Sequence, residues 1–519
     1  MSHPIDKLPA KEAGRIASHL RVFGLDPKIH FKGHLDVPEG KPLRLTHATH
    51  TTGHHALIKP RDIDHAKLAV GIPDCAFDGM NYISRFPMQE PVCVEQDRCD
   101  LCPDAYRRLR IAAHCYIFGP SYRYAHMKTA INKFIVPVLE SEVLVYTQLD
   151  IRSELILGNE GRPIVLIAHT INFYPGGSIR VVGNCELIVQ STYVNYHTSQ
   201  SSRAKIFGEG DGVRINLGTA QGGADGPDAS NEGNKSKADN GKNGTNGGCC
   251  DSGTSPTNGE NGETGNSAKP GQPGKPGESI HPTVWYIQTL NTNVDVVAKG
   301  GSGGKGGNGG KGGNGGDGGN AGTINGPATG GKGGNGGDGG AGGNGGDGGF
   351  GGDVAIYAED LTTKSFNADT AGGIGGKGGN GGEPGLPGFG GTGTPNGSNG
   401  APGLAGVPGT SGLSGRNGTI ITAKITPPSI STFSPMNGPA TGGTVLAITG
   451  ANFAKSSDGS VVTEFLIDNV LCTNIVIKSS TSAEVTTPVL NPGTYPIVVV
   501  NLVTKAAAAS PLGFTVDAA

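Results

Sequence analysis

The feature that most limits what this chain can fold into is a set of long tracts made largely of glycine. From Gly303 to Gly352 glycine fills about two positions in three, and the 519-residue chain holds 92 glycines. A residue without a side chain has almost nothing to bury, so these tracts cannot form an ordinary hydrophobic core. Bare backbones can instead approach one another and pair their N–H and C=O groups, which must be satisfied wherever they are buried.

The tracts have a period of three residues, as in GGKGGNGG beginning at Gly303. Polyproline-II-type helices have three residues per turn and no internal hydrogen bonds, so two glycines in three leave two bare edges for lateral pairing. The third position carries Lys, Asn, Asp or Ala, which we expect to face water or the corners of a bundle. Turn-forming sequence near the middle of 222–280, 300–352 and 372–418 predicts three hairpins.

Two other structures fit part of this pattern. Residues 401–415, APGLAGVPGTSGLSG, have the glycine period of a collagen triple helix, but the GGX tracts hold almost no proline. A disordered linker is the second alternative, because glycine-rich composition is typical of flexible chains. The nearly identical tracts that begin at Gly300 and Gly372, and the regular strands between them, favour order.

Short β-branched runs separated by turn residues lie before and between the tracts. Val284 and Val354 occupy matching places in two of these runs, 70 residues apart. Such a repeat predicts a mostly β fold in which polyglycine-II helix hairpins are inserted into a β-solenoid-like scaffold. We assign the β-scaffold to 141–221 and the polyglycine-II bundle with its interspersed strands to 222–426.

The first 140 residues are predicted to form a mixed α/β attachment domain containing cysteine and histidine. The segment DAYRRLRIAAHCYIF within it has the apolar spacing of one helix.

The C-terminal residues 427–519 alternate apolar and polar residues between turn glycines, which predicts a small β-sandwich. They resemble the immunoglobulin-like IPT/TIG family, which implies the same sandwich. Some members of that family bind DNA, but this stretch has three lysines against five acidic residues, which disfavours DNA binding. The positions that carry the resemblance are Ile430, Pro435, Gly438, Gly442, Gly443, Thr444, Ile448, Gly450, Phe453, Cys472, Pro488, Gly493 and Val498.

The tracts between about 222 and 418 resemble the polyglycine-II bundles of phage tail-fibre tip adhesins. More loosely, they are similar to snow flea antifreeze proteins and to the glycine-rich repeats of mycobacterial surface proteins. This resemblance is compositional, so it carries information on fold better than on function.

Two groups in the first quarter of the chain are candidate metal ligands, with zinc as the expected ion. One is the cysteine group Cys93, Cys99, Cys102 and Cys115, and the other is the histidine group His47, His50, His54 and His55. Thiolates with a CxxC element suit zinc, but a disulfide pair or free buried thiols fit the cysteines as well. The histidines suit zinc or nickel, and contact with receptor glycans or a solvated polar loop fits them as well.

The hairpin turns are the candidate binding loops, because loops on a rigid scaffold commonly carry recognition. Cys249 and Cys250 at the first turn also suit a covalent lock or a link between two molecules. The candidate residues are Asn246 and Gly247, Cys249, Cys250, Asp251, Asn325, Pro327, Asn396 and Asn399.

Composition and motifs exclude several classes of function. The net charge is -3 and there is no basic run, so we expect no nucleic-acid partner. No stretch reaches the roughly 20 apolar residues of a membrane span, and the N-terminus lacks a secretory signal pattern. Nucleophile-elbow, P-loop and zinc-protease motifs are absent. Asp150 and Asp211 are scattered acids that suit a β-helical polysaccharide enzyme only if they share one face.

The sequence therefore predicts a non-enzymatic structural or adhesive protein of a virion or cell surface, outside the cell. Its partners would be a surface receptor or glycan and other subunits of a larger assembly, with the chain itself an oligomer. An ice-binding protein and a β-helical carbohydrate-active enzyme are the alternatives.

Overall fold

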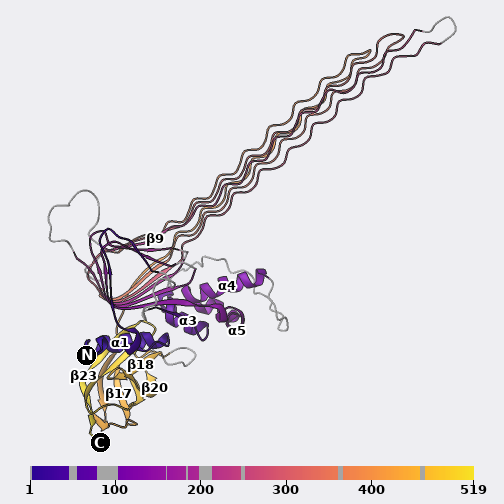
Figure 1. Cartoon of the computed structure of the whole chain (residues 1–519). Coiled ribbons are helices and arrows are strands. Elements are labelled where there is room, and N and C mark those ends of the chain that lie inside the picture. Colours follow the sequence, from indigo (N-terminus) through magenta and orange to yellow (C-terminus); the bar gives the residue numbers. More distant parts are fainter. Residues whose placement is uncertain are drawn as a thin grey trace.

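A computed structural model gives the fold of most of the chain. The described residues are 3–45, 55–78, 103–158, 161–182, 185–197, 213–246, 252–360, 366–455 and 462–518. Figure 1 shows a compact part made of sheets and helices, from which a long shaft projects. Among the described residues, no helix is both long and apolar enough to cross a bilayer.

The larger sheet, sheet A, has eight strands in the order β1-β4-β6-β8-β10-β12-β14, with β3 antiparallel beside β4. Neighbours along this path are parallel. Its strands are β1 (His34–Val37), β3 (His55–Ile58), β4 (Ser141–Ile151), β6 (Ile164–Phe173), β8 (Leu187–Tyr196), β10 (Thr283–Leu290), β12 (Val354–Asp360) and β14 (Ile420–Lys424).

The smaller sheet, sheet B, is also parallel, in the order β13-β11-β9-β7-β5-β2. From β4 to β14 successive strands alternate between the two sheets. The strands of sheet B are β2 (Leu43–Leu45), β5 (Glu154–Leu157), β7 (Ser178–Val181), β9 (Val213–Thr219), β11 (Val294–Lys299) and β13 (Phe366–Asp369).

Sheet A is apolar on both faces because it lies between two hydrophobic cores. Trp285 and Ile287 of β10 point into the core between the sheets, whereas Val284 and Tyr286 point into the core on the other side. This burial on both faces is typical of parallel sheets and explains the continuous apolar runs of β4, β6 and β8.

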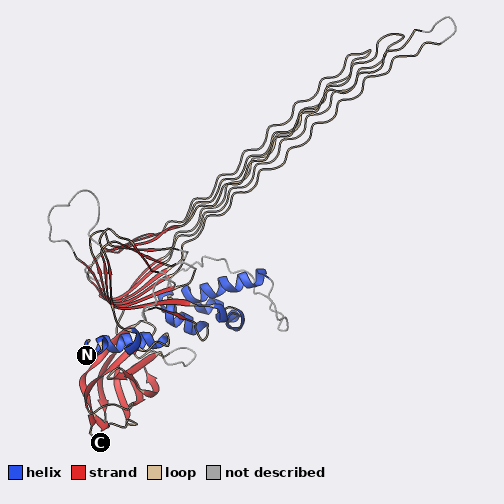
Figure 2. Ribbon diagram, in the orientation of Figure 1, coloured by secondary structure: helices blue, strands red, loops and turns tan. Residues whose placement is uncertain are grey.

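Helices supply the second core and cover the outer face of sheet A (Figure 2). The predicted helix DAYRRLRIAAHCYIF is confirmed as α4. Asp62 caps α3 by accepting a hydrogen bond from the His65 N–H. The helices are η1 (Pro4–Lys7), α1 (Ala10–Val22), α2 (Pro27–His30), α3 (Ile63–Val70), η2 (Asp74–Phe77), α4 (Pro103–Phe118), η3 (Ser121–Met127), α5 (Lys128–Phe134) and η4 (Val136–Val138).

The predicted fold class is therefore wrong. The chain forms two parallel β-sheets with flanking helices, an α/β arrangement, and an Ig-like sandwich follows; it is not a β-solenoid-like scaffold. Short β-branched runs between turns occur in a β-solenoid and in an α/β fold alike. The helices that distinguish the two folds lie within 1–140, far from the repeats. The polyglycine-II assignment is likewise not supported, since the tracts carry no assigned helix and the strands among them complete sheets A and B.

The glycine-rich tracts form six extended segments, called legs here, that lie side by side as the shaft (Figure 1). Legs 1, 3 and 5 leave from β9, β11 and β13 of sheet B, and legs 2, 4 and 6 lead into β10, β12 and β14 of sheet A. The two sheets thus continue outward as two layers of three legs. The legs are 220–246, 252–279, 300–322, 330–352, 371–393 and 396–418.

Lateral backbone hydrogen bonds join neighbouring legs at every third residue. In leg 3 the first glycine of a triplet, Gly306, donates to Lys377 O of leg 5 at 2.8 Å, and the next, Gly307, donates to Gln272 O of leg 2 at 2.8 Å. A Cβ on Gly306 would lie 1.9 Å from Gly343 O, and one on Gly307 would lie 2.1 Å from Pro227 O. Both positions therefore have to be glycine.

The third position of each triplet has a role that the sequence did not predict. Its N–H is bonded in many triplets by a side-chain oxygen from the next leg of the same layer. Asn308 N donates to Asp228 Oδ1 at 2.6 Å, and Asn308 Oδ1 in turn accepts from Asn380 N at 2.9 Å. Asn and Asp at this position thus link legs rather than only facing water.

The C-terminal sandwich packs a four-stranded sheet, β15-β17-β21-β20, on a five-stranded sheet, β16-β23-β22-β18-β19. Phe465, Phe514 and Val499 are among the fully buried side chains between them. The strands are β15 (Ser429–Ser434), β16 (Asn437–Pro439), β17 (Val445–Ala451), β18 (Thr463–Ile467), β19 (Val470–Leu471), β20 (Thr473–Ser479), β21 (Ser482–Thr486), β22 (Gly493–Asn501) and β23 (Ala506–Asp517).

Helix α1 fastens the sandwich to sheet A. The buried Arg15 donates from Nε to Lys505 O of the sandwich at 2.9 Å, and from its two terminal nitrogens to Thr192 Oγ1 and Ser191 O of β8 at 2.9 and 2.8 Å. Burial lowers the pKa of Arg15 to about 10. Because the Arg15 guanidinium hydrogen-bonds to both the sandwich and β8, we infer that α1, sheet A and the sandwich pack in a fixed arrangement.

Candidate metal centre

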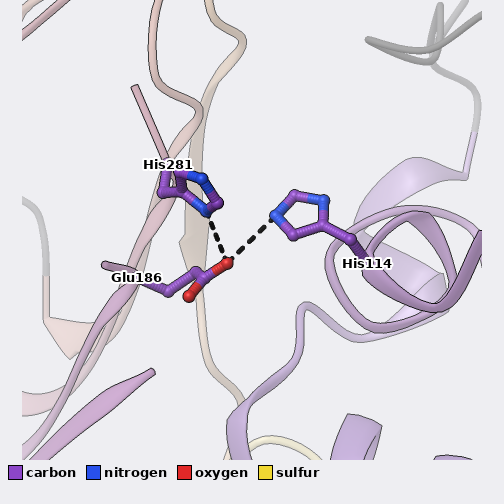
Figure 3. A group of neighbouring side chains, drawn as sticks. All are labelled: His114, Glu186 and His281. Atoms are coloured by element: carbon purple, nitrogen blue, oxygen red, sulfur yellow. Dashed lines mark hydrogen bonds and ion pairs between the residues drawn. The ribbon is translucent and has the colours of Figure 1, made fainter. Parts of the chain in front are cut away.

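Three potential metal ligands meet at the edge of sheet A where the parallel strands begin (Figure 3). Glu186 directly precedes β8, and His281 lies two residues before β10. Because Leu187 of β8 pairs with Thr283 of β10, the residues just before these strands share one edge. His114 reaches the same point from α4.

The three side chains converge on one carboxylate oxygen. Glu186 Oε1 lies 2.6 Å from His281 Nδ1 and 3.2 Å from His114 Nε2. One ligand atom from each residue lies within 4.8 Å of the others. The Glu186 side chain is 6% exposed, whereas those of His114 and His281 are 20% and 32% exposed, so the carboxylate is the inner member of the group.

The histidines determine the charge of Glu186. Burial on its own would raise the pKa of this carboxyl, but His281 and His114, by charge and hydrogen bonding, hold it well below its usual range. Glu186 is therefore a carboxylate at neutral pH, the form that binds a cation. Two imidazole nitrogens and one carboxylate oxygen are a donor set that zinc accepts.

The predicted cysteine and histidine metal groups are mostly outside the described residues. Cys93, Cys99, Cys102, His47, His50 and His54 lie there. Cys115 is buried in the core on the outer face of sheet A, next in sequence to His114, and it is not a member of the described ligand group. His55 of β3 contacts the carboxylate of Glu142 on β4. Zinc binding by these groups stays a prediction.

Sequence reasoning did not find Glu186 and His281. They lie 95 residues apart, with leg 1 and leg 2 between them, and neither belongs to a local motif. The available signal was the position of each residue, since each lies within two residues of the start of an apolar run that becomes a strand of one parallel sheet. Only the strand order, which the fold provides, makes those starts adjacent.

The predicted tip residues fall into two groups. Gly247, Cys249, Cys250 and Asp251 lie outside the described residues, and Asn246 is the last described residue before them.

The described tip asparagines take part in the turns themselves. Asn325, at positive φ, donates from its side chain to Thr245 O, which joins two of the tips. Asn396 and Asn399 accept from Gly393 N and Gly390 N, each at 2.9 Å. Pro327 follows Asn325 in the second tip. Ligand binding by these tips stays a prediction.

Of the two acids considered for a polysaccharide enzyme, Asp150 is among the described residues. Asp211 lies outside them. Asp150 accepts from Asn172 Nδ2 at 2.8 Å and from Gln148 Nε2 at 3.0 Å. Burial opposes ionisation, but these hydrogen bonds and His34 keep the pKa of Asp150 below its ordinary value. Asp150 is thus engaged in a polar ladder across the strands.

Comparison with known protein families gives one match, and it decides the identity of the C-terminal sandwich. Residues 428–516 are an IPT/TIG domain. This confirms the resemblance drawn from the glycines and apolar residues of that stretch. The domain accounts for the end of the chain, and no curated protein matches the sequence.

Solved structures that resemble the chain do so over a small part. A protein of unknown function from Bacteroides thetaiotaomicron is 15% identical, with a TM-score of 0.16, over 18% of this chain and 23% of that one. The extracellular region of plexin A4 is 19% identical, with a TM-score of 0.15, over 19% of this chain and 9% of that one. Murine CEACAM1b is 14% identical, with a TM-score of 0.13, over 20% of this chain and 49% of that one. The chain thus covers less than half of each, and these TM-scores carry no argument.

Proposed function

We propose that this protein is a non-enzymatic structural or adhesive component of a virion or cell surface. In this proposal the two sheets, their helices and the IPT/TIG domain form a base, and the shaft presents its tips to a receptor, a glycan or another subunit. The observation that carries the proposal is the ladder of lateral hydrogen bonds along the legs. A laterally bonded shaft positions its tips without the entropic cost of ordering them on binding.

The dimensions of the shaft fit a presenting role. A leg of 23 residues, such as 300–322, can span up to about 80 Å when extended. The tips are therefore held far from the base (Figure 1). Because the three N–H groups of the Gly306–Asn308 triplet are all bonded to neighbouring legs, bending the shaft there would break several bonds at once.

The third hairpin supports contact with a protein partner. Leu404, Val407 and Leu413 of leg 6 have exposed fractions of 73%, 68% and 75%. Leg 5 likewise exposes Leu386 and Phe389, at 61% and 69%. Large apolar side chains presented in a row are typical of interaction surfaces, whereas legs 1 and 2 carry mainly charged and polar residues at their exposed positions.

Binding to a panel of glycans and intact cells tests the proposal with two variants and a control. One variant changes the tip residues Ile324 and Pro327 to serine, and the other changes Leu404, Val407 and Leu413 to serine. The control is Lys377→Ser, another exposed third-position residue of the third hairpin. We expect the wild type and the control to bind and at least one variant to lose binding by tenfold or more.

The competing functions have distinct readouts in the same protein. Thermal hysteresis without cell or glycan binding would replace the proposal with ice binding, and turnover of a polysaccharide would replace it with catalysis. A wild-type protein that binds nothing in the panel, or variants that all bind like the wild type, would contradict a display function.

A further inference from the structure

We propose that His114, Glu186 and His281 bind a single zinc-type divalent metal ion that fastens α4 to the root of the shaft. The group combines three elements that are distant in sequence: a helix on the outer face of sheet A, the start of β8, and the residues that join leg 2 to β10. This proposal does not depend on the display function.

The spacing of the ligand atoms is close to that of a zinc site. Four ligands at about 2.0–2.1 Å around a tetrahedral ion are separated from one another by roughly 3.3 Å. The two imidazole nitrogens here lie 2.6 and 3.2 Å from Glu186 Oε1, and all three atoms lie within 4.8 Å. Small side-chain rotations therefore suffice to admit the ion.

The burial of the three side chains provides both a pocket and an access route. Glu186 is nearly enclosed, and the partly exposed imidazoles lie on the solvent side, where an ion can enter and a water molecule can complete the coordination. The main chain that carries this side chain is fixed, since the backbone carbonyl of Glu186 accepts from Ile164 N at 2.8 Å.

The location of the group gives the ion a mechanical role. His281 is two residues beyond the end of leg 2, and Ile280 N bonds Phe350 O where leg 4 enters the base. His114 also packs its ring against Phe118 and His281, at centroid distances of 5.0 and 5.3 Å. Coordination of the ion by His114 would therefore link α4 to the place where legs 2 and 4 join the base.

Metal analysis of the purified full chain tests the proposal, with Glu186→Gln and His281→Asn as the site variants. Glu186→Gln keeps the size of the side chain, so we expect it to keep the fold. The control is His197→Asn, an exposed histidine just after β8 whose ring bonds Asn172. We expect both site variants to lose one zinc ion per chain and to weaken zinc binding by more than about 100-fold. The control should retain the wild-type content.

Two further measurements separate this site from the cysteine group. Zinc should raise the melting temperature of the wild type and of His197→Asn but not of Glu186→Gln. The Co²⁺ spectrum of the wild type minus that of Glu186→Gln should show nitrogen and oxygen ligation without thiolate bands. Equal zinc content in wild type and site variants, or a difference spectrum with thiolate bands, would overturn the proposal.

Discussion

Adding one methyl group to the centre of the shaft should open it locally. In Gly343→Ala the new Cβ would lie 2.1 Å from Gln272 O, whereas an ordinary contact needs 3.4 Å, so legs 2 and 4 would have to separate by 3.4 − 2.1 = 1.3 Å. Three bonds are strained by that movement: Gly271 to Ala341, Gly274 to Asn344, and Gly307 to Gln272, now 2.8–2.9 Å long. At roughly 1 kcal/mol each, their loss destabilises the local structure by about 3 kcal/mol.

Hydrogen exchange read by mass spectrometry measures this effect. A loss of about 3 kcal/mol corresponds to roughly 100-fold faster exchange in peptides from legs 2, 3 and 4 around the substitution. Gly233→Ala in leg 1 is the matched control, because a Cβ there meets nothing within 4 Å. The control should exchange like the wild type. Equal exchange in Gly343→Ala and Gly233→Ala would refute the close-approach reasoning.

Three further predictions concern the shaft, the base and the junction with the IPT/TIG domain. Asn335 Oδ1 accepts from Ala401 N, so Asn335→Ala should speed exchange at Ala401 about tenfold while Asn335→Asp leaves it nearly unchanged, and equal rates would contradict the side-chain link. Trp285 is fully buried between the sheets, so Trp285→Ala should lower the free energy of unfolding by about 3–5 kcal/mol in denaturant titrations followed by circular dichroism. Burial lowers the pKa of Lys505 to about 7 from 10.5. Between these two pH values the unfolded chain binds more protons than the folded one, so the melting temperature should rise from pH 7 toward pH 9. If the melting temperature of Lys505→Met rises with pH as steeply as that of the wild type, Lys505 is not the cause.

The parts of the fold that local sequence determines were predictable. The glycines and alternating residues of 428–516 were sufficient to indicate the IPT/TIG domain, and α4 followed from its apolar spacing. The tracts were also expected to bond laterally, because glycine at two of three positions has no other means of satisfying a buried backbone.

The parts that depend on which segments become neighbours were not predictable. Asn308 is a polar residue of the kind expected to face solvent, and its hydrogen bond to leg 5 exists only because legs 3 and 5 are neighbours in one layer. The solenoid prediction failed for a similar reason, since the helices on sheet A are encoded far from the strands they cover. His281 joins Glu186 only through the parallel pairing of β8 and β10.

Small-angle X-ray scattering on the intact, monodisperse protein tests the central claim most directly, namely that the glycine-rich legs form one ordered shaft. The account predicts a rod-like cross-section and a maximum dimension that exceeds the base by up to about 80 Å. That dimension should shorten by up to about 30 Å when nine residues are deleted from every leg. A scattering curve of a compact body with flexible chains, whose dimension does not follow leg length in this way, would contradict it.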